Sequence, residues 1–265
     1  IMRAYTKLVE DAGELKGLEA YSASRPPHSE GLAITIASYL AYETELPNIN
    51  LLHLSSRKAI EAAMMMQETF PHINFRREVT VGHLLADYNT ANMGGKVNPP
   101  LRSPEDVEAL WEHLLAGDFS WVTSDHACCK DETKFGDPRD DVFLATSGFG
   151  GAEYLLPGMI SEGRKRGLSY NRIAELVSKN PAERYGMPDK GDLAVGFDAD
   201  FCLVDDGVQY TVRAEDSMST QDYTPFEGFE LTAAVTDTYL RGSKVFGDGA
   251  MVGEPRGQYV KRSGN

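Results

Sequence analysis

The chain has 265 residues, of which 42% are hydrophobic and 25% are charged, and its formal net charge at pH 7 is −14. These values are typical of a globular protein with one large core or two smaller ones. The acidic balance argues against a nucleic-acid-binding protein, which usually carries a basic patch. No apolar run approaches the roughly 20 residues that a membrane-spanning helix needs, and no signal peptide is visible at the start.

The cysteines indicate a reducing environment. Cys128, Cys129 and Cys202 make an odd number, and two of them are neighbours in the sequence. This pattern does not fit a disulfide framework, which uses an even number of spaced cysteines. We therefore expect a cytoplasmic protein with free thiols.

Helical and extended patterns alternate up to about residue 180. Ser103 followed by Pro104 marks one helix start, with serine as the N-cap and proline in the first turn. The alternation predicts a mostly parallel sheet, as in a barrel or a doubly wound fold. The expected elements are a helix over 31–45, a strand over 48–56, a helix over 57–70, a strand over 73–81, a helix from 104 to 117 and a strand over 119–124.

The pattern changes after Pro188, where glycines separate short runs of β-forming residues. Two such runs are DFCLVDD at 200–206 and TDTYLRGSKVF at 236–246. Short β-rich segments of this kind predict a second, smaller β domain.

Two polar residues stand at the predicted carboxyl ends of strands. His53 follows the strand that begins near residue 48, and Asp125 follows the strand expected over 119–124. In a parallel βα barrel these ends form the active site. An imidazole and a carboxylate there suit a divalent metal such as zinc, and a carboxylate beside metal-bound water can act as a general base. Singly, each residue fits a structural role better, and two ligands do not complete a metal site.

Several further segments lie in a fixed order along the chain. They are SRPPHSE at 24–30, LLHLSS at 51–56, REVTVGHLL at 77–85, KVNPPLRSPED at 96–106, TSDHA at 123–127, SGFGGAEYLLP at 147–157, NPAERYG at 180–186, KGDLAVGFDAD at 190–200, YTPFEGFE at 223–230 and GEPRGQYVKR at 253–262. With these segments the chain resembles the cyclic-amidohydrolase branch of the amidohydrolase superfamily, which includes hydantoinases, dihydropyrimidinases, allantoinases and dihydroorotases.

The resemblance implies an α/β fold: the C-terminal portion of a TIM (β/α)8 barrel followed by a small β-sandwich domain. The implied boundaries are 1–187 for the barrel part, 188–252 for the β domain and 253–265 for a C-terminal tail. The tail resembles one that reaches a neighbouring subunit in tetrameric relatives, so a homo-oligomer is expected.

The resemblance also implies a binuclear divalent metal centre, with zinc as the expected metal. His53 would be a ligand of the second metal. Asp125 would be a ligand of the first metal and the proton shuttle of the hydrolysis. Asn98 and Ser147 would bind the substrate, a small cyclic amide. His126 would support the site without binding metal.

Four further ligands of the family lie upstream: a His-x-His pair, a carboxylated lysine and a histidine after the fifth strand. This chain begins beyond those positions, so it holds two of six expected ligands. We therefore expect it to be part of a longer enzyme and to be inactive by itself. His83 could touch the substrate, although a structural role fits it better.

The substrate stays open at this level, because hydantoin, dihydropyrimidine, allantoin and dihydroorotate types all fit the motifs. A different class of function is also possible: a non-catalytic, dihydropyrimidinase-like scaffold protein that keeps the fold and loses metal ligands. The retained His53 and Asp125 argue against that alternative.

Overall fold

The computed structural model describes residues 1–262, which divide into two compact units. Unit 1 consists of Ile1–Glu153 together with Val212–Phe229, and unit 2 consists of Tyr154–Thr211 and the chain from Glu230 onward. Residues 263–265 of the expected tail lie outside the described residues. The expected domain boundaries at 187/188 and 252/253 stay predictions.

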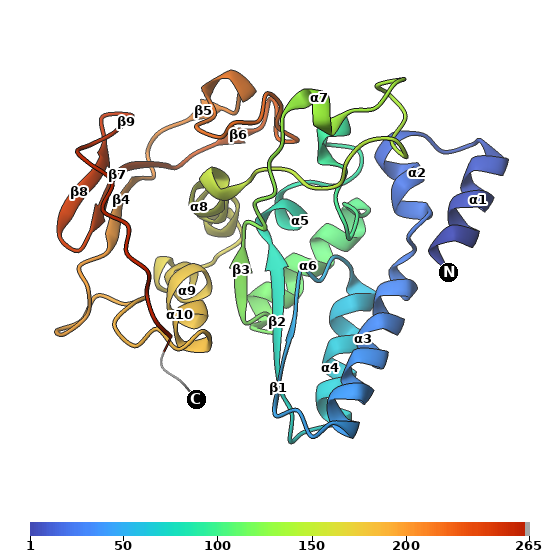
Figure 1. Cartoon of the computed structure of the whole chain (residues 1–265), viewed down its shortest axis with the longest axis horizontal. Coiled ribbons are helices and arrows are strands. Elements are labelled where there is room, and N and C mark those ends of the chain that lie inside the picture. Colours follow the sequence, from blue (N-terminus) through green and yellow to red (C-terminus); the bar gives the residue numbers. More distant parts are fainter. Residues whose placement is uncertain (263–265) are drawn as a thin grey trace. The chain divides into compact units, whose positions relative to one another are not determined.

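Unit 1 alternates helices with short strands (Figure 1). Its helices are α1 (Met2–Ala12), α2 (Gly17–Ala23), α3 (Pro27–Glu43), α4 (Arg57–Thr69), α5 (Val81–Leu85), α6 (Pro104–Ala116) and α7 (Asp131–Lys134). Its strands are β1 (Asn48–Leu51), β2 (Asn74–Thr80) and β3 (Trp121–Thr123). Every helix and strand expected between residues 31 and 124 is therefore present, with boundaries that differ by a few residues.

The three strands form one parallel sheet in the order β1-β2-β3. In the register, Leu51 lies opposite Arg77 and Glu78 lies opposite Trp121. Because all three strands run in the same direction, their carboxyl ends lie at one edge of the sheet. The residues that follow β1 and β3 are thus presented on the same side.

Local sequence signals set the ends of the long helices. The Ser103 hydroxyl accepts the Asp106 N–H at 3.2 Å, and Gly117 closes α6 with a φ of 89°. The Ser56 hydroxyl likewise accepts the Ala59 N–H at the start of α4. Serine at the N-cap satisfies amide groups that have no partner inside the helix, and glycine adopts the left-handed closing conformation at little cost.

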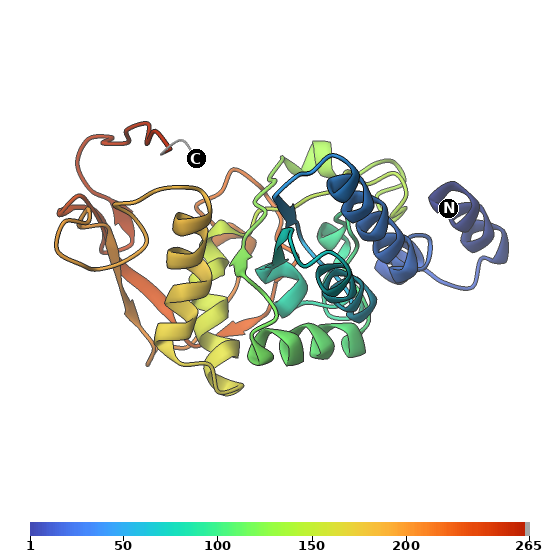
Figure 2. The ribbon, with the colours of Figure 1, turned by 90° about the horizontal axis from the view of Figure 1, so that it is seen from below.

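The helix α3 packs on β1 and α4 packs on β2, while α6 packs on α4 and α5 (Figures 1 and 2). Ile60 and Ala63 of α4, Val79 of β2, and Leu110 and Trp111 of α6 are fully buried and fill this core. The other side of α3 is different: Leu32, Ile36 and Leu40 are exposed, and β1 lies at one edge of the sheet.

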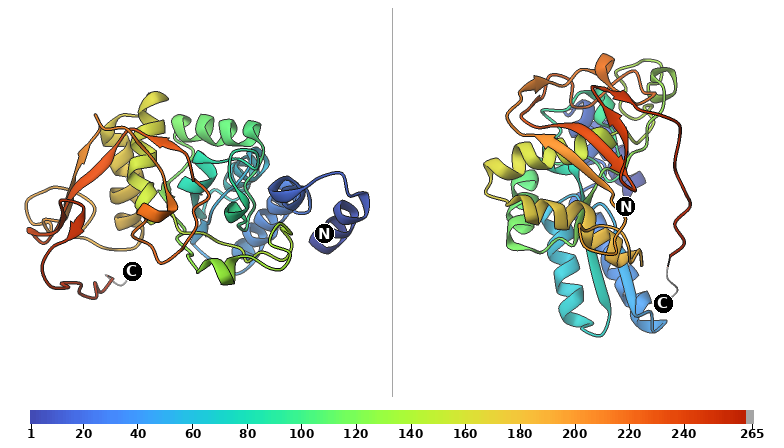
Figure 3. Two further views of the ribbon diagram at one scale, coloured as in Figure 1. Left: turned by 90° about the horizontal axis from the view of Figure 1, so that it is seen from above. Right: turned by 90° about the vertical axis from the view of Figure 1, so that its left-hand side faces the viewer.

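Unit 2 combines α-helices with antiparallel strands (Figure 3). The helices are α8 (Leu155–Lys165), α9 (Tyr170–Ala174) and α10 (Asn180–Arg184). The strands β4 (Phe201–Asp205), β7 (Ala234–Leu240), β8 (Ser243–Gly247) and β9 (Ala250–Met251) form one sheet, and β5 (Tyr210–Thr211) pairs with β6 (Glu230–Leu231). The β-rich character expected after residue 188 is confirmed, whereas the specific β-sandwich stays a prediction.

Among the helices of residues 1–262, none has the length and apolar character needed to cross a membrane.

Candidate functional site

The two expected metal ligands share an unusual backbone conformation. His53 lies two residues beyond β1 with a φ of 40°, and Asp125 lies two residues beyond β3 with a φ of 47°. A left-handed conformation costs a residue other than glycine on the order of 1–3 kcal/mol, and it persists only where the surroundings enforce it. The structure thus places both side chains at the same sheet edge, on backbone held away from its preferred conformation.

The separation of the two ligands follows from the sheet. The strand β2 lies between β1 and β3, so at about 4.8 Å per strand the two chain ends are about 10 Å apart. His53 is half-buried and Asp125 is exposed. Within residues 1–262, no three His, Cys, Asp or Glu side chains gather in a group that could hold a metal ion. The described chain therefore offers these two donors without completing a site around either.

A buried ion pair lies beneath the segment that carries His53. One carboxylate oxygen of Glu30 accepts both the Ser55 hydroxyl at 2.6 Å and the Arg102 guanidinium at 3.2 Å, and its other oxygen accepts the Ser55 N–H at 2.9 Å. Arg102 also donates to the Ser55 hydroxyl at 3.0 Å and to the carbonyl of Arg25. Three of the sequence motifs, at 24–30, 51–56 and 96–106, therefore meet at this ion pair.

Burial shapes the electrostatics of the pair. The side chain of Arg102 is only 2% exposed and that of Glu30 is 14% exposed. Burial lowers the pKa of Arg102, and the neighbouring Glu30 carboxylate raises it. Removing one partner of such a pair leaves the other charge buried and unpaired, which typically costs about 3–5 kcal/mol.

The two expected substrate-binding residues contact each other. Asn98 donates its side-chain amide to the Ser147 hydroxyl at 3.1 Å, and the Tyr21 hydroxyl donates to the Asn98 side-chain oxygen at 2.7 Å. The Tyr21 and Ser147 hydroxyl oxygens are 3.3 Å apart, so a third hydrogen bond closes the triangle. We call these three residues the Tyr21 triad. Each residue in it can donate one hydrogen bond and accept one.

Tyr21 is a residue that the sequence motifs do not reveal. It lies in α2, three residues before the segment SRPPHSE, and is buried. The guanidinium carbon of Arg25 stands 3.9 Å from the centre of its aromatic ring. A buried tyrosine needs a partner for its hydroxyl. Asn98 supplies that partner from a position 77 residues away in the chain.

Two buried lysines fix the loops that carry Asn98 and Ser147. The Lys134 ammonium donates to the carbonyl of Lys96 at 2.9 Å and to the carbonyl of Gly148 at 2.6 Å. The Lys96 ammonium donates to the carbonyl of Ala145. Burial lowers the pKa of Lys134 to about 8. These bonds tie residues next to Asn98 to residues next to Ser147, so the two loops keep a fixed spacing.

The loop that follows Asp125 packs on the loop that follows Ser147. The Ala127 N–H donates to the Phe149 carbonyl at 3.0 Å, and His126 accepts the N–H groups of Gly151 and Ala152 through Nδ1, each at 3.2 Å. His126 therefore supports the loop with one ring nitrogen, in keeping with its expected role.

His83 is buried and holds the loop that leads into Asn98. Its Nδ1 lies 2.7 Å from the Thr80 hydroxyl, and its Nε2 lies 3.0 Å from the Pro99 carbonyl. Since only a ring N–H can donate to a carbonyl, Nε2 carries the proton and Nδ1 accepts from Thr80. Burial lowers the pKa of His83 to about 4, an effect that the Pro99 hydrogen bond partly offsets. The structural role preferred for His83 agrees with these contacts.

One cavity of about 710 Å³ brings His53 and Asn98 together. Arg25, Glu30 and Arg102 also line it, along with apolar residues of α1, α3 and β1. Its lining among residues 1–262 does not include Asp125 or Ser147. The cavity thus joins one expected metal ligand to one expected substrate-binding residue.

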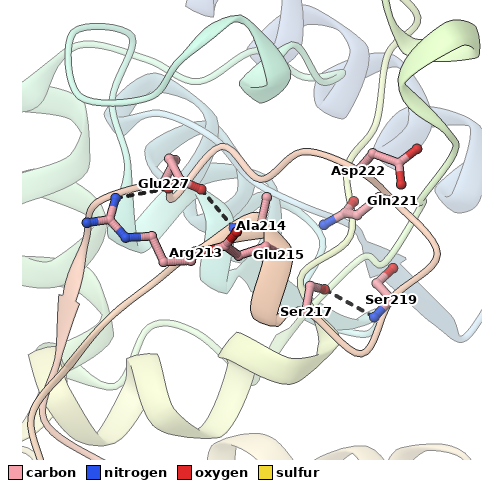
Figure 4. A pocket seen from close by; sticks show the side chains of 8 residues that line it. All are labelled: Arg213, Ala214, Glu215, Ser217, Ser219, Gln221, Asp222 and Glu227. Carbon is pink, nitrogen blue, oxygen red and sulfur yellow. Dashed lines mark hydrogen bonds and ion pairs between the residues drawn. The ribbon is translucent and has the colours of Figure 1, made fainter.

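A second cavity in unit 1 contains no expected site residue (Figure 4). Its walls come from residues 213–227, where Arg213 forms an ion pair with Glu227 at 3.0 Å and the Ser219 N–H donates to the Ser217 hydroxyl. These polar groups bind one another, and the geometry assigns no chemistry to this cavity.

The chain is similar to several known proteins. The model of the amidohydrolase family matches residues 43–245. The chain is 37% identical over 245 residues to the allantoinase of Rubrobacter xylanophilus, covering 91% of this chain and 53% of that protein. It is 32% identical over 247 residues to the dihydroorotase of Halobacterium salinarum, covering 92% of this chain and 55% of that protein.

Solved structures give the same result. The L-hydantoinase (dihydropyrimidinase) of Arthrobacter aurescens superimposes with a TM-score of 0.87 at 33% identity, covering 96% of this chain and 56% of that chain. The chain belongs to the amidohydrolase family, in its cyclic-amidohydrolase branch, and the barrel-type α/β fold of unit 1 is that of the family. It spans about half the length of the curated relatives that it matches.

The Tyr21 triad predicts a specific loss of stability. Changing Tyr21 to Phe keeps the aromatic packing and removes the donor to Asn98, so we expect the free energy of unfolding to fall by about 1 kcal/mol. Urea unfolding measures this change. Tyr259 is 92% exposed, and Tyr259→Phe is the matched control. Equal effects of the two substitutions would contradict a stabilising role for the hydrogen bonds of the Tyr21 triad.

The buried imidazole predicts a pH dependence of stability. The folded pKa of His83 is about 4 and its unfolded pKa is about 6.5. Between these values the unfolded chain binds a proton that the folded chain does not, so stability falls as pH drops from 6.5 to 4. We expect His83→Gln, which can keep both hydrogen bonds, to remove on the order of 3 kcal/mol of that fall.

Urea unfolding at pH 4, 5, 6 and 7 tests this expectation. His72 is exposed, and His72→Gln provides the control that also removes one titrating imidazole. A pH profile of His83→Gln as steep as that of the wild type would show that His83 is not the responsible group.

Proposed function

We propose that this chain forms part of a metal-dependent hydrolase that opens the ring of a small cyclic amide or imide. The observation that carries the proposal is the placement of His53 and Asp125. Both follow strands of one parallel sheet and both have positive φ, and the cavity that His53 lines is also lined by Asn98. Residues with a strained backbone at the carboxyl ends of parallel strands are typical of active sites.

The two donors suit a binuclear metal centre. Imidazole and carboxylate are ligands that zinc prefers, and both donors follow strand ends at the same edge of the sheet. When bound, two such metals would lower the pKa of a bridging water and polarise the amide carbonyl. His53 would hold the second metal and Asp125 the first, and zinc is the expected metal.

Asp125 is the proposed proton carrier. It is exposed, so its carboxylate is open to solvent and to a bound substrate. It would take the proton from the attacking water and deliver it to the nitrogen that leaves when the ring opens. General acid–base catalysis of this kind needs the carboxylate within hydrogen-bond distance of both atoms.

Asn98 and Ser147 would bind the ring amide. Their side chains already bond to each other and to Tyr21, so we infer that the substrate meets main-chain N–H and C=O groups of the two loops. A cyclic amide offers one N–H and one C=O side by side, which two such loops can match. Hydantoin, dihydropyrimidine, allantoin and dihydroorotate types all have this feature.

Activity would require a longer protein than this chain. The expected His-x-His pair, carboxylated lysine and fifth-strand histidine are absent from it, so the chain by itself is proposed to be inactive. The exposed apolar side of α3, the edge position of β1 and the apolar cavity between them support an additional partner segment there. A cytoplasmic location and a homo-oligomer, a tetramer by analogy, complete the proposal.

The scaffold alternative has less support. A scaffold protein would not need His53 and Asp125 on strained backbone, and every similar protein described above is named as an enzyme.

Metal content and activity test the proposal together. The protein that carries the upstream ligands should contain about two zinc-like ions per chain by elemental analysis. It should also hydrolyse at least one of hydantoin, dihydrouracil, allantoin and dihydroorotate. A metal-free protein that is inactive on all four would refute the proposed function.

Loss of the proton carrier predicts a fall in turnover. We expect Asp125→Asn in that longer protein to lower kcat by about 10²–10⁴-fold, because the amide cannot accept the proton. Asp140→Asn, at an exposed position, is the control. An Asp125→Asn enzyme with unchanged kcat would show that another group carries the proton.

The tail predicts an effect on assembly. Removing residues 253–265 from the longer protein should lower its mass in solution by light scattering, since the tail is proposed to reach a neighbouring subunit. An unchanged mass would refute that role.

A further inference from the structure

A buried carboxylate in the central strand contacts both strands that lead to the expected metal ligands. Glu78 lies in β2 and is 7% exposed. Its Oε1 accepts the backbone N–H of His53 at 3.1 Å, and its Oε2 accepts the indole N–H of Trp121 at 2.8 Å. His53 follows β1, and Trp121 begins β3, which leads to Asp125.

The turn that carries His53 is fixed by three consecutive N–H groups. The His53 N–H bonds to the Glu78 carboxylate, the Leu54 N–H bonds to the Glu78 main-chain carbonyl at 2.9 Å, and the Ser55 N–H bonds to the Glu30 carboxylate at 2.9 Å. Two of the three acceptors belong to Glu78. Since backbone N–H groups at a buried turn must find partners, these acceptors enforce the positive φ of His53.

The carboxylate is costly for packing alone. Desolvating a carboxylate costs several kcal/mol, and an apolar residue of similar size would fill the same space without that cost. Both of the donors described here are neutral N–H groups, so neither cancels the charge. What the carboxylate provides is two acceptor atoms on one rigid group, directed at two different strands.

We infer that Glu78 is the positioning residue of the site: it sets the orientation of His53 and couples the end of β1 to β3. Its role deepens the proposed function, on which the inference rests. Glu78 touches neither of the expected donor side chains in the contacts described. It acts through the backbone of His53 and through Trp121.

Substitution of Glu78 by Gln tests the inference on the chain itself. Glutamine keeps the shape but has one carbonyl oxygen, so it can accept from only one of the two donors while its NH2 group faces the other. The chain has two tryptophans, and the indole N–H of Trp111 donates to the Leu84 carbonyl instead. The two indole signals in a ¹⁵N-labelled sample therefore provide a probe and an internal control.

In Glu78→Gln we expect the Trp121 indole signal and the His53 backbone amide signal to shift. We also expect at least one of these two protons to exchange with solvent about tenfold faster, as fits the loss of a hydrogen bond to a charged group. The Trp111 signal should stay in place. Glu68→Gln, at an exposed position of α4, should change neither signal. Unchanged His53 signals in Glu78→Gln would overturn the inference.

Trp121→Phe provides a second variant in case Glu78→Gln does not fold. It assigns the Trp121 indole signal by removing it, and it leaves Glu78 with one donor. If Glu78 couples the strands, the His53 amide signal shifts in this variant too. A His53 signal that does not move would overturn the coupling.

Kinetics of the longer protein separate the inference from the proposed function. With Glu78→Gln we expect kcat to fall about tenfold or more while KM stays within about twofold. The change would displace His53, the expected metal ligand, and leave the loops with Asn98 and Ser147 intact. A wild-type enzyme that is active and a variant with unchanged kcat would overturn the positioning role and leave the proposed function standing. A wild type inactive on every cyclic amide would refute the function, and the NMR signals would still decide whether Glu78 holds His53.

Discussion

The buried ion pair between Arg102 and Glu30 is the contact on which the organisation of unit 1 depends. It joins three chain segments that are far apart in sequence, and it satisfies the Ser55 N–H and hydroxyl and the Arg25 carbonyl at the same time. A buried pair of this kind contributes little net stability but is costly to break, so it favours one arrangement of the segments over the alternatives. The segment with His53 and the loop with Asn98 are therefore set relative to each other before any ligand binds.

The other polar contacts of the site repeat the same principle on a smaller scale. The Tyr21 triad fixes Asn98 against Ser147, and Lys134 fixes the main chain close to each of them. Each cluster places charged or hydrogen-bonding groups in the interior. There every group needs a hydrogen-bond partner, because an unpaired buried polar group destabilises the fold. These hydrogen bonds connect the two loops to each other at several points.

Sequence reasoning reached the elements and the two strand-end donors, and it stopped where contacts become long-range. Periodicity and the capping residues Ser103 and Gly117 report on neighbours within a few positions, so the helices and strands of unit 1 were predictable. His53 and Asp125 were recognised because a strand end is a local feature. Tyr21, Glu78 and Lys134 were missed, since the partners of their side-chain hydrogen bonds lie between 14 and 126 residues away and no local pattern reports such contacts. The joining of residues 212–229 to unit 1 is long-range for the same reason.

The positive φ of His53 and Asp125 links the fold to the proposed chemistry. Each conformation costs free energy that an ordinary turn with glycine would avoid, and each is held by contacts from other strands and loops. If the two side chains served only to end their strands, glycine or asparagine would do so at lower cost. The two positions lie about 10 Å apart on one edge of the sheet. An imidazole and a carboxylate there are suited to binding a common ligand such as a metal centre. The proposed metal centre would give both donors a partner, and this would account for a conformation that an ordinary strand end does not need.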